Sequence, residues 1–275
     1  MSRNYKLPRD KKIKLSQFDP DDTASFKDKD EVAEHYAKLK EELTELQDML
    51  FAEKKHSLLI IFQGMDCSGK DGVIKKVLSG VNPQGFKVNS FKKPTIEESA
   101  HDFLWRAHKE TPERGFITAF NRSYYEDVLI TRVHNQIDDE EAEKRFKHIK
   151  SFEKLLADHD TIILKIFLHI SKDFQIQKIE ERLHNPAKKW KFDPSDLLER
   201  NYWDAYQKAY EGVFTNCNSK EAPWHLVPAN NRWYRDYVVL GLLVDALKKL
   251  SLSYPDPEIP MEDLIGLLPM GSKPK

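Results

Sequence analysis

The sequence predicts an α/β protein with a mostly parallel five-stranded sheet that is flanked by helices. Two observations lead to this fold class. Five short apolar runs alternate with longer segments of helical character, and strands that alternate with helices form parallel sheets covered on both faces. In addition, the first apolar run ends in a glycine-containing loop that leads directly into a helix. Such a loop lies at the carboxyl edge of a parallel sheet, where α/β proteins bind their ligands.

The first quarter of the chain begins with polar residues. Residues 1–30 are charged and Asp-rich, which predicts an irregular arm. Over residues 30–54 apolar side chains recur with 4-3-4-3-4 spacing, which marks one face of a helix. A dimeric coiled coil would give the same pattern, but fewer than four heptads favour packing on the domain. The apolar run 57–64 predicts a buried strand, and residues 73–80 predict a helix that ends at Gly80.

The middle of the chain supplies two further strands with helices beside them. Residues 87–91 and 115–120 are short apolar segments that predict the second and third strands. Between them, Thr95 and Glu98 form a capping-box pattern, which predicts the start of a helix over 95–110.

The third strand leads into a segment, 121–134, that changes from polar to helical. A charged helix over 140–160 follows it, and the apolar run 161–170 predicts the fourth strand.

A charged helical pair follows the fourth strand, over about 171–212, and we expect it to form a lid. Ser171 is a helix-capping residue, and the sequence H-N-P at 184–186 stops the first helix. Asp193, followed by Pro194, predicts the start of the second helix.

The chain ends with a fifth strand and a long helix. The strand is predicted over 224–229 and the amphipathic helix over 232–250. We therefore divide the chain into an N-terminal arm and helix (1–56), a main domain with its lid (57–250) and a C-terminal tail (251–275).

Composition limits the partners and the location. The 275 residues are 40% hydrophobic, enough for a real core. Lys and Arg number 44 against 45 Asp and Glu, so no overall charge favours nucleic acid, and none is expected as a partner. No uncharged apolar run approaches the ~18 residues of a membrane span, the N-terminus lacks the apolar segment of a secretion signal, and two cysteines are too few for a disulfide framework. We expect a cytoplasmic protein without a membrane partner.

The loop after the first strand carries the phosphate-binding pattern G-x-x-x-x-G-K. Glycines let backbone N–H groups converge on an anion, the helix N-terminus adds partial positive charge, and the lysine bridges phosphates as a point charge. A surface lysine on a tight turn would leave both glycines unexplained. The predicted phosphate-binding residues of the loop are Gly64, Cys67, Ser68, Gly69, Lys70 and Asp71.

Two acids lie in this loop, which lacks the usual hydroxyl ligand of Mg²⁺. Asp71 occupies the position where Ser or Thr would hold Mg²⁺, and in the first turn of a helix it can equally serve as a cap. Asp66 is a hard oxygen donor suited to Mg²⁺, with Mn²⁺ as an alternative, either directly or through water. Its structural alternative is to cap the following helix. Cys67 is interpreted as a small apolar filler rather than a redox centre.

Polar residues also follow the third strand. Asn121 can ligate a metal weakly or orient its water, whereas the planar fork of Arg122 matches phosphate. Ser123 and Glu126 form an S-x-x-E pattern, so a capping box explains Glu126 as well as substrate contact does. The candidates for nucleotide binding are Asn121, Arg122, Glu126, Asp127 and Arg132, of which the last two are the weaker.

The helical pair is rich in basic residues. These are Lys178, Arg182, Lys188, Lys189, Lys191 and Arg200. Five acids between 178 and 200 nearly balance them, which favours a solvated face. Three of the lysines, however, bunch around Trp190 clear of acids, which favours a lid that grips phosphate. Both interpretations stay open.

The remaining aromatic and histidine residues carry less chemistry. Trp203, Tyr206 and Tyr210 recur at helical spacing and predict core packing rather than base stacking. The histidines show no ligand spacing with cysteine, so a zinc site is not expected, and no Ser-His-Asp grouping stands out. Transfer between phosphates needs no general base, because the attacking oxygen is already ionised.

The sequence resembles the polyphosphate kinase 2 family. The resemblance covers about residues 57–240 and rests on collinear motifs: GMDCSGKDG, NPQGFKVNSFKKP, FNRSYYEDVLITRVH, KIFLHISK, ERLHNPAKKWKFDPSDLLERNYWDAY and APWHLVPANNRWYRDYVV. It implies a P-loop kinase fold resembling thymidylate kinase, with a helical lid and Mg²⁺ as cofactor. By position, Asp66 would be a metal ligand, Lys70 the loop lysine and Arg122 a contact to nucleotide phosphate. The implied lid cations are Arg182, Lys189 and Arg200.

The resemblance also implies an activity, namely transfer of a terminal phosphoryl group from inorganic polyphosphate to AMP or ADP, with GMP and GDP as further acceptors. ADP-using members commonly have Asp where this chain has Asn121, and Asn where it has Glu126, so the motif is more similar to the subgroup that accepts both AMP and ADP. Lys178 stands where relatives often have Arg, which weakens bidentate gripping there. A homo-oligomer, dimer or tetramer, is also expected. The rival interpretations are an ATP-dependent nucleoside monophosphate kinase of the same fold and a non-catalytic phosphate-binding regulator.

Overall fold

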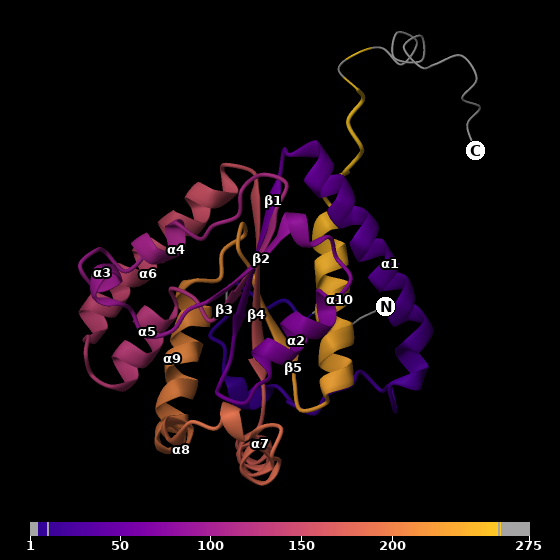
Figure 1. Cartoon of the computed structure of the whole chain (residues 1–275). Coiled ribbons are helices and arrows are strands. Elements are labelled where there is room, and N and C mark those ends of the chain that lie inside the picture. The colour runs from indigo at the N-terminus through magenta and orange to yellow at the C-terminus, as the bar shows by residue number, and fades with distance from the viewer. Residues whose placement is uncertain (1–4, 10, 258, 260–275) are drawn as a thin grey trace.

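Five parallel strands form the centre of the molecule, in the order β2-β3-β1-β4-β5 (Figure 1). The computed structural model describes residues 5–9, 11–257 and 259. The strands are β1 (Ser57–Gln63), β2 (Phe86–Ser90), β3 (Ile117–Asn121), β4 (Thr161–His169) and β5 (Trp224–Pro228). Each lies within two residues of its predicted position, and the pairs between neighbouring strands are parallel. The predicted sheet is therefore confirmed.

The middle strand, β1, explains why the sheet needs a cover on both faces. Every residue of β1 is buried, and Ile60 pairs with Ala119 of β3 on one side and Leu164 of β4 on the other. A strand with apolar side chains on both faces is stable only between two layers of helices. The loop that follows β1 consequently begins at the centre of the carboxyl edge of the sheet.

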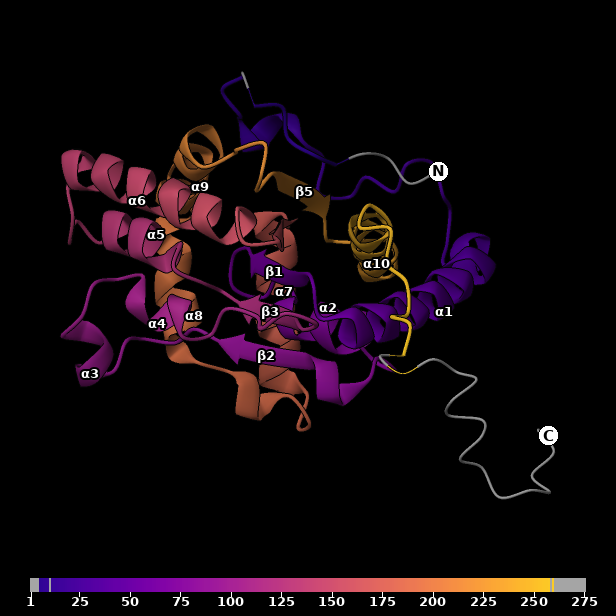
Figure 2. The same cartoon turned by 90° about the horizontal axis from the view of Figure 1, so that it is seen from above.

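Helices cover the two faces in separate groups (Figure 2). One group consists of α1 (Asp30–Glu53), α2 (Lys70–Val77) and α10 (Arg232–Lys248). The other consists of α5 (Glu126–Val133), α6 (Asp139–Ala157) and α9 (Trp203–Asn216). The apolar face of α1 contains buried Leu39, Leu43 and Leu50 and packs beside α10. This face therefore packs on the domain, as expected, instead of forming a coiled coil. Within the described residues no helix has both the length and the apolar character to cross a bilayer.

The N-terminal arm is irregular, as predicted, apart from one short 3-10 helix, η1 (Leu15–Gln17). Its described part packs firmly on the domain. The Leu7 N–H donates to the carbonyl of Trp224 at 2.8 Å, and Lys6 forms an antiparallel bridge with His225 of β5. The predicted C-terminal tail falls mainly on residues outside the described part of the chain.

Two expected helices differ from the structure. The single helix over 95–110 is wrong: two short helices, α3 (Ile96–Ser99) and α4 (Trp105–His108), stand in its place, although the capping box of Thr95 and Glu98 is formed. Asp102 accepts a hydrogen bond from the Leu104 N–H at 3.0 Å, a turn that competes with the helix. The helix after the loop begins at Lys70 instead of residue 73 and ends at Val77.

The lid segment, defined here as residues 171–202, lies at the end of the sheet beyond β4 (Figure 1). It contains α7 (Lys172–His184), η3 (Lys189–Lys191), α8 (Pro194–Glu199) and η4 (Arg200–Tyr202). Ser171 and Asp193 cap α7 and α8 as predicted.

The last part of the expected lid range belongs instead to α9. The aromatic residues Trp203 and Tyr210 of this helix are buried in the core, which confirms core packing for them.

Candidate active site

The phosphate-binding loop runs from the end of β1 to the start of α2. Its glycines are required because neighbouring atoms lie too close to leave room for a side chain. Gly69 has φ +90°, and a Cβ there would lie 2.3 Å from an Nη atom of Arg235. Gly64 has φ +151°, and its Cβ would lie 2.8 Å from both the Leu168 carbonyl and Ser68 Oγ. Any side chain at either position would be strained and would collide. The loop conformation is thus fixed by the residues behind it.

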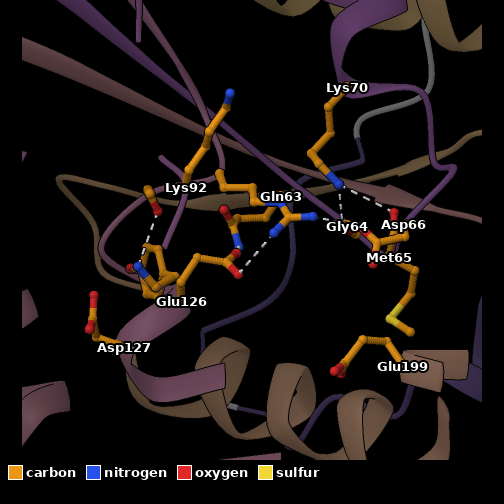
Figure 3. A network of polar contacts seen from close by, with 12 residues as sticks. Gln63, Gly64, Met65, Asp66, Lys70, Lys92, Glu126, Asp127 and Glu199 are labelled. Atoms are coloured by element: carbon orange, nitrogen blue, oxygen red, sulfur yellow. Dashed lines mark hydrogen bonds and ion pairs between the residues drawn. The ribbon is translucent and has the colours of Figure 1, made fainter. Parts of the chain in front are cut away.

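Lys70 lies folded over this loop (Figure 3). Its Nζ donates to the Gly64 carbonyl at 2.8 Å and the Met65 carbonyl at 3.3 Å, and the residue is only 8% exposed. Burial lowers the pKa of Lys70, and the nearby Arg122 lowers it further, while Asp66 opposes both. A buried ammonium that is already stripped of water interacts strongly with an incoming phosphate.

Arg122 and Asp66 join the end of β3 to the loop. Arg122 has φ +61°, a conformation that costs a non-glycine residue about 1–2 kcal/mol, and its N–H donates to the Phe62 carbonyl at 3.0 Å. Its guanidinium donates to Asp66 Oδ1 at 2.7 Å. Burial lowers the pKa of Arg122, but Glu126 and Asp66 together raise it more, so the net shift is upward. The capping alternative for Asp66 is not formed, because no side chain caps α2.

Glu126 takes part in the site rather than in a capping box. The N-cap of α5 is Tyr125, without a side-chain cap, and Ser123 Oγ accepts from the Tyr125 N–H instead. Glu126 accepts a hydrogen bond from Gln63 Nε2 at 3.0 Å and lies 3.9 Å from Arg122. Figure 3 shows Gln63 and Glu126 facing each other. Gln63 is fully buried and was missed from sequence, where the only signal is a polar residue at the end of an apolar strand.

Asn121 and Asp71 connect β3 to the first turn of α2. Asn121 Nδ2 donates to Asp71 Oδ1, and both residues line the cavity in front of the loop. The amide therefore fixes the orientation of an acid that stands where the usual loop has a hydroxyl.

A cavity of about 580 Å³ opens between the loop, the ends of β2 and β3, and the lid segment. Most of the site residues predicted in the loop and at the end of β3 line this cavity. They are Asp66, Cys67, Gly69, Lys70, Asp71, Asn121 and Arg122. Arg182, Trp190, Asp193 and Asp196 of the lid segment line the opposite side. Phe91, Lys92 and Lys93 at the end of β2 complete the wall. The two lysines were missed as site residues, although they lie in a motif that carries the family resemblance.

A narrower cavity of about 170 Å³ adjoins the first. The two share Cys67, Gly69, Asp71 and Arg182, and the narrower one adds Gly72, Lys178, Glu181, Lys188, Arg232 and Arg235. Together the described linings contain nine basic and five acidic side chains. An excess of positive charge in a cleft concentrates anions, so the joined cavities suit a polyanion.

Arg232 and Arg235 of α10 are further residues that sequence reasoning missed. Arg235 is 3% exposed, donates to Asp236 at 2.6 Å and reaches the Ser68 carbonyl at 3.5 Å. In the sequence both arginines fall at the start of an amphipathic helix, and nothing local shows that this helix begins beside the loop.

The basic residues of the lid segment are held by carboxylates. Arg182 donates to Asp196 at 2.7 Å, and Lys178 and Lys188 both pair with Glu181. Hydrogen bonds from Lys188 and Lys178 lower the pKa of Glu181 to about 2. Burial, together with the charge of Asp66, raises the pKa of Asp196 to about 6, against the opposing effect of Arg182.

The other lid candidates lie differently. Lys189 is exposed and lines neither cavity. Arg200 donates to the Lys172 carbonyl and to Gln175 Oε1, and Gln175 in turn donates to the Asp66 carbonyl at 3.1 Å. Arg200 thus supports the loop through Gln175. The side chain of Lys191 is outside what the structure describes.

Asp127 and Arg132 do not reach the loop. Asp127 pairs with Arg106 at 3.3 Å, and burial raises its pKa despite that arginine. Arg132 pairs with Asp139 at 2.7 Å and lines a separate cavity. Cys67 is 7% exposed, and burial raises the pKa of its thiol to about 11, as suits a filler rather than a reactive thiolate.

The acids of the loop fit a magnesium ion only together with a substrate. Mg²⁺ binds one or two carboxylates along with substrate phosphates and keeps several waters. Asp66 and Asp71 both line the larger cavity, and the described residues hold no group of three or more His, Cys, Asp or Glu that would form a cage by themselves. The two carboxylates are therefore suited to a magnesium ion that is also bound by the phosphates of a substrate.

Fold and site together define a P-loop transferase of the kinase type, with the lid segment facing the loop across the larger cavity. Comparison with known proteins gives the family. Residues 26–254 match the family model described as polyphosphate kinase 2, and the chain belongs to this family.

Similar proteins cover nearly the whole chain. An AMP/ADP-polyphosphate phosphotransferase of Meiothermus ruber is 46% identical over 96% of this chain and 99% of its own length. An ADP-polyphosphate phosphotransferase of Rhodopseudomonas palustris is 45% identical over 82% of this chain and 84% of its own. The crystal structure of polyphosphate kinase 2 from Arthrobacter aurescens TC1 superimposes with a TM-score of 0.91 at 40% identity, covering 96% of this chain and 94% of that one. The predicted fold is thereby confirmed.

Proposed function

We propose that the protein transfers a terminal phosphoryl group from inorganic polyphosphate to AMP or ADP, and also catalyses the reverse reaction. One observation carries the proposal. Two cavities, one narrow and strongly basic and one wide enough for a nucleotide, meet at Gly69 and Asp71 of the loop. A phosphoryl transfer between two phosphate compounds needs both substrates to meet at one point. The names of the relatives support polyphosphate and adenine nucleotides as that pair.

The chemistry follows from positioning and charge. An oxygen of the acceptor's terminal phosphate forms the new P–O bond, while the bond between the terminal phosphorus and its bridging oxygen in polyphosphate breaks. The shortened polyphosphate leaves with the electron pair as a phosphate oxyanion. The acceptor oxygen is already ionised, so no general base is needed. Arg182 lines both cavities, while Lys70 and Arg122 line the larger one, and these three cations stabilise the charge on the transferring group.

Magnesium is part of the proposal, with Mn²⁺ as an alternative. Asp66 and Asp71 would hold the ion together with phosphate oxygens, and the ion would neutralise charge on the phosphates. Asp66 is paired with Arg122 at 2.7 Å; with the ion bound, Asp66 would hold the ion and Arg122 would be left to bind phosphate. In this view the Asp66–Arg122 ion pair keeps both groups in place between turnovers.

A donor–acceptor matrix tests the function. The purified protein is given polyphosphate, ATP or GTP as the sole donor, with AMP, ADP, GMP or GDP as acceptor and Mg²⁺ present, and products are separated by chromatography. We expect ADP and ATP to form when polyphosphate is the sole donor. Turnover of AMP with ATP but not with polyphosphate would instead show a nucleoside monophosphate kinase. Binding of polyphosphate without turnover in any combination would show a regulator.

A further inference from the structure

We propose that Gln63 is a positioning residue for the acceptor nucleotide, because its amide holds the carboxylate of Glu126 beside Arg122. This inference rests on the proposed function, in which Arg122 binds phosphate of the substrates. Gln63 ends the central strand β1 and is fully buried. Neither Gln63 nor Glu126 lines the two cavities described at the loop, whereas Arg122 lines the larger one. Gln63 therefore acts on the substrate through its neighbours and not by direct contact.

The amide of Gln63 has one orientation that suits its surroundings (Figure 3). Its Nε2 donates to Glu126 Oε1 at 3.0 Å and reaches the hydroxyl of Tyr210 at 3.5 Å. Exchanging the nitrogen and the oxygen of the amide would place a carbonyl oxygen against the carboxylate, and neither group could donate. The amide therefore serves as a donor that holds one oxygen of Glu126 in place.

This amide also carries a cost that an apolar side chain would avoid. Among the described residues, Gln63 Oε1 is buried without a hydrogen-bond partner, which is unfavourable for a polar atom. The preceding residues of the strand, 58–62, are apolar and buried, so a methionine would suit the strand equally well. A strand that keeps an amide here keeps a hydrogen-bond donor, and Glu126 is the charged group that uses it.

Glu126 joins Gln63 to the guanidinium of Arg122. While its Oε1 accepts the hydrogen bond from Gln63, its Oε2 lies 3.9 Å from one Nη atom of Arg122. The other Nη atom of Arg122 donates to Asp66 at 2.7 Å. Two carboxylates thus hold the two arms of the guanidinium, one from the loop and one from α5.

The two carboxylates have different tasks in the proposed reaction. Asp66 would hold the magnesium ion, which leaves Glu126 as the carboxylate beside Arg122 in the described part of the chain. Glu126 keeps the guanidinium in one orientation only while its own position is fixed, and Gln63 supplies the fixed donor. A planar guanidinium binds phosphate well when its orientation is set in advance. Gln63 therefore contributes to the affinity for a nucleotide phosphate without touching it.

Calorimetry of AMP and adenosine binding tests the proposal, with Mg²⁺ present and polyphosphate absent. Adenosine lacks the phosphate that Arg122 binds, so it reports changes that do not involve this arginine. The variants are Gln63→Met, which keeps the shape and removes the donor, Glu126→Gln, and the double variant. Thr118→Val is the matched control. Thr118 is also fully buried, lies on the neighbouring strand β3, and has a hydroxyl without a hydrogen-bond partner among the described residues.

We expect Gln63→Met and Glu126→Gln each to weaken AMP binding about tenfold, the effect of losing one hydrogen bond to a charged group, and to leave adenosine binding unchanged. The double variant should bind AMP no more weakly than Glu126→Gln, because Gln63 acts through Glu126. Gln63→Met should melt within a few degrees of the wild type, since methionine removes the unpaired oxygen together with the donor. Thr118→Val should bind both ligands as the wild type does.

Four results would overturn the proposal. Equal weakening of AMP and adenosine would mean that Gln63 only shapes the site. Unchanged AMP binding in Gln63→Met, with the fold verified by circular dichroism, would mean that the amide has no part in binding. A double variant weaker than Glu126→Gln would mean that Gln63 acts by another route. Stronger AMP binding by Glu126→Gln would mean that this carboxylate repels phosphate instead of holding Arg122.

The last of these results keeps the test open to refutation even if Gln63→Met does not fold. The side chain of Glu126 is partly exposed, so its replacement by an amide of the same shape disturbs the fold little. Because binding is measured without a donor, each result is separate from the proposed function, which the donor–acceptor matrix decides.

Discussion

The two sides of the site are built differently. On the loop side, Lys70 and Gln63 are buried, and they are held by backbone carbonyls and by residues of neighbouring strands and helices. On the lid side, Arg182, Lys178 and Lys188 are partly exposed and held by the carboxylates of Asp196 and Glu181. Those carboxylates present the same charge as phosphate oxygens, so a bound polyanion can replace them.

This difference assigns the two sides distinct tasks. The loop side cannot move without disturbing the sheet, and such preorganised charge is what stabilises a transferring phosphoryl group. The lid side exchanges one set of anions for another at small net cost, because exposed ion pairs contribute little. We therefore expect loop variants to affect turnover, and lid variants to affect polyphosphate binding and its response to solution conditions.

The largest effect is expected at the loop. Lys70→Ala should lower kcat with polyphosphate and ADP by about 10²–10³-fold or more, because a preorganised charge at the transferring group is removed. Lys76→Ala is the control, since Lys76 is exposed on the last turn of the same helix and should change kcat less than about twofold. Steady-state kinetics with both variants would refute the division of tasks if Lys70→Ala changed only KM.

A smaller effect is expected from single lid lysines. Polyanion binding releases counterions, so affinity falls steeply with salt, with a slope of about 0.7 per phosphate neutralised by analogy with single-stranded nucleic acid. Lys188→Gln should raise the KM for polyphosphate several-fold and reduce this slope by about 0.7. Lys189→Gln should do so less, because Lys189 is exposed outside the cavities. Measuring the KM for polyphosphate from 50 to 400 mM KCl checks this expectation. If the KM of the wild type did not change with salt, the lid lysines would be solvated surface residues that do not bind polyphosphate.

The smallest effect concerns Asp196 and pH. Its folded pKa of about 6 lies above the ordinary value of a carboxyl group. Between about pH 4 and 6 the folded protein thus holds a proton that the unfolded chain has lost. The contribution of Asp196 to stability consequently falls as pH rises through this window and is constant above it.

Urea unfolding of the wild type and Asp196→Asn checks this expectation. From pH 4 to pH 6.5 the free energy of unfolding of Asp196→Asn should increase relative to that of the wild type, because only the wild type loses the contribution of the protonated carboxyl group. The expected increase is only about 1 kcal/mol, because the carboxylate lies on the cavity wall within reach of solvent. Curves that stay parallel across this range would show that the environment does not shift the carboxyl group.

The features that were predicted correctly from the sequence, namely the strands, the loop and Arg122, are those that local residue patterns determine. The apolar alternation gave the strands, and the glycine spacing with Lys70 located the loop. Arg122 was found because a cation that ends an apolar strand lies at the edge of the sheet. Glu126 shows the limit of local patterns: an S-x-x-E sequence suits a capping box, but the buried amide of Gln63 offers a tertiary partner.

The remaining site residues come from packing between distant segments. Arg235 reaches the loop only because α10 packs beside α2. Lys92 and Lys93 line the cavity because β2 ends next to β3. The failed helix over 95–110 has a different cause. Ile96 is 93% exposed, so the first turn of the segment has no apolar packing, whereas Phe103, Leu104 and Ala107 further along pack against the core. Packing therefore holds only the second half of the segment in place, which is too little to support one long helix.

The contact between Arg235 and the loop has a consequence for how the enzyme matures. Gly69 is made early in synthesis, whereas the guanidinium that packs directly behind it belongs to the last long helix. A nascent chain on the ribosome therefore carries a complete loop sequence without the wall that shapes it. The growing polypeptide therefore acquires this wall only after Arg235 has been synthesised, and a product interrupted before that residue lacks the guanidinium that packs behind Gly69.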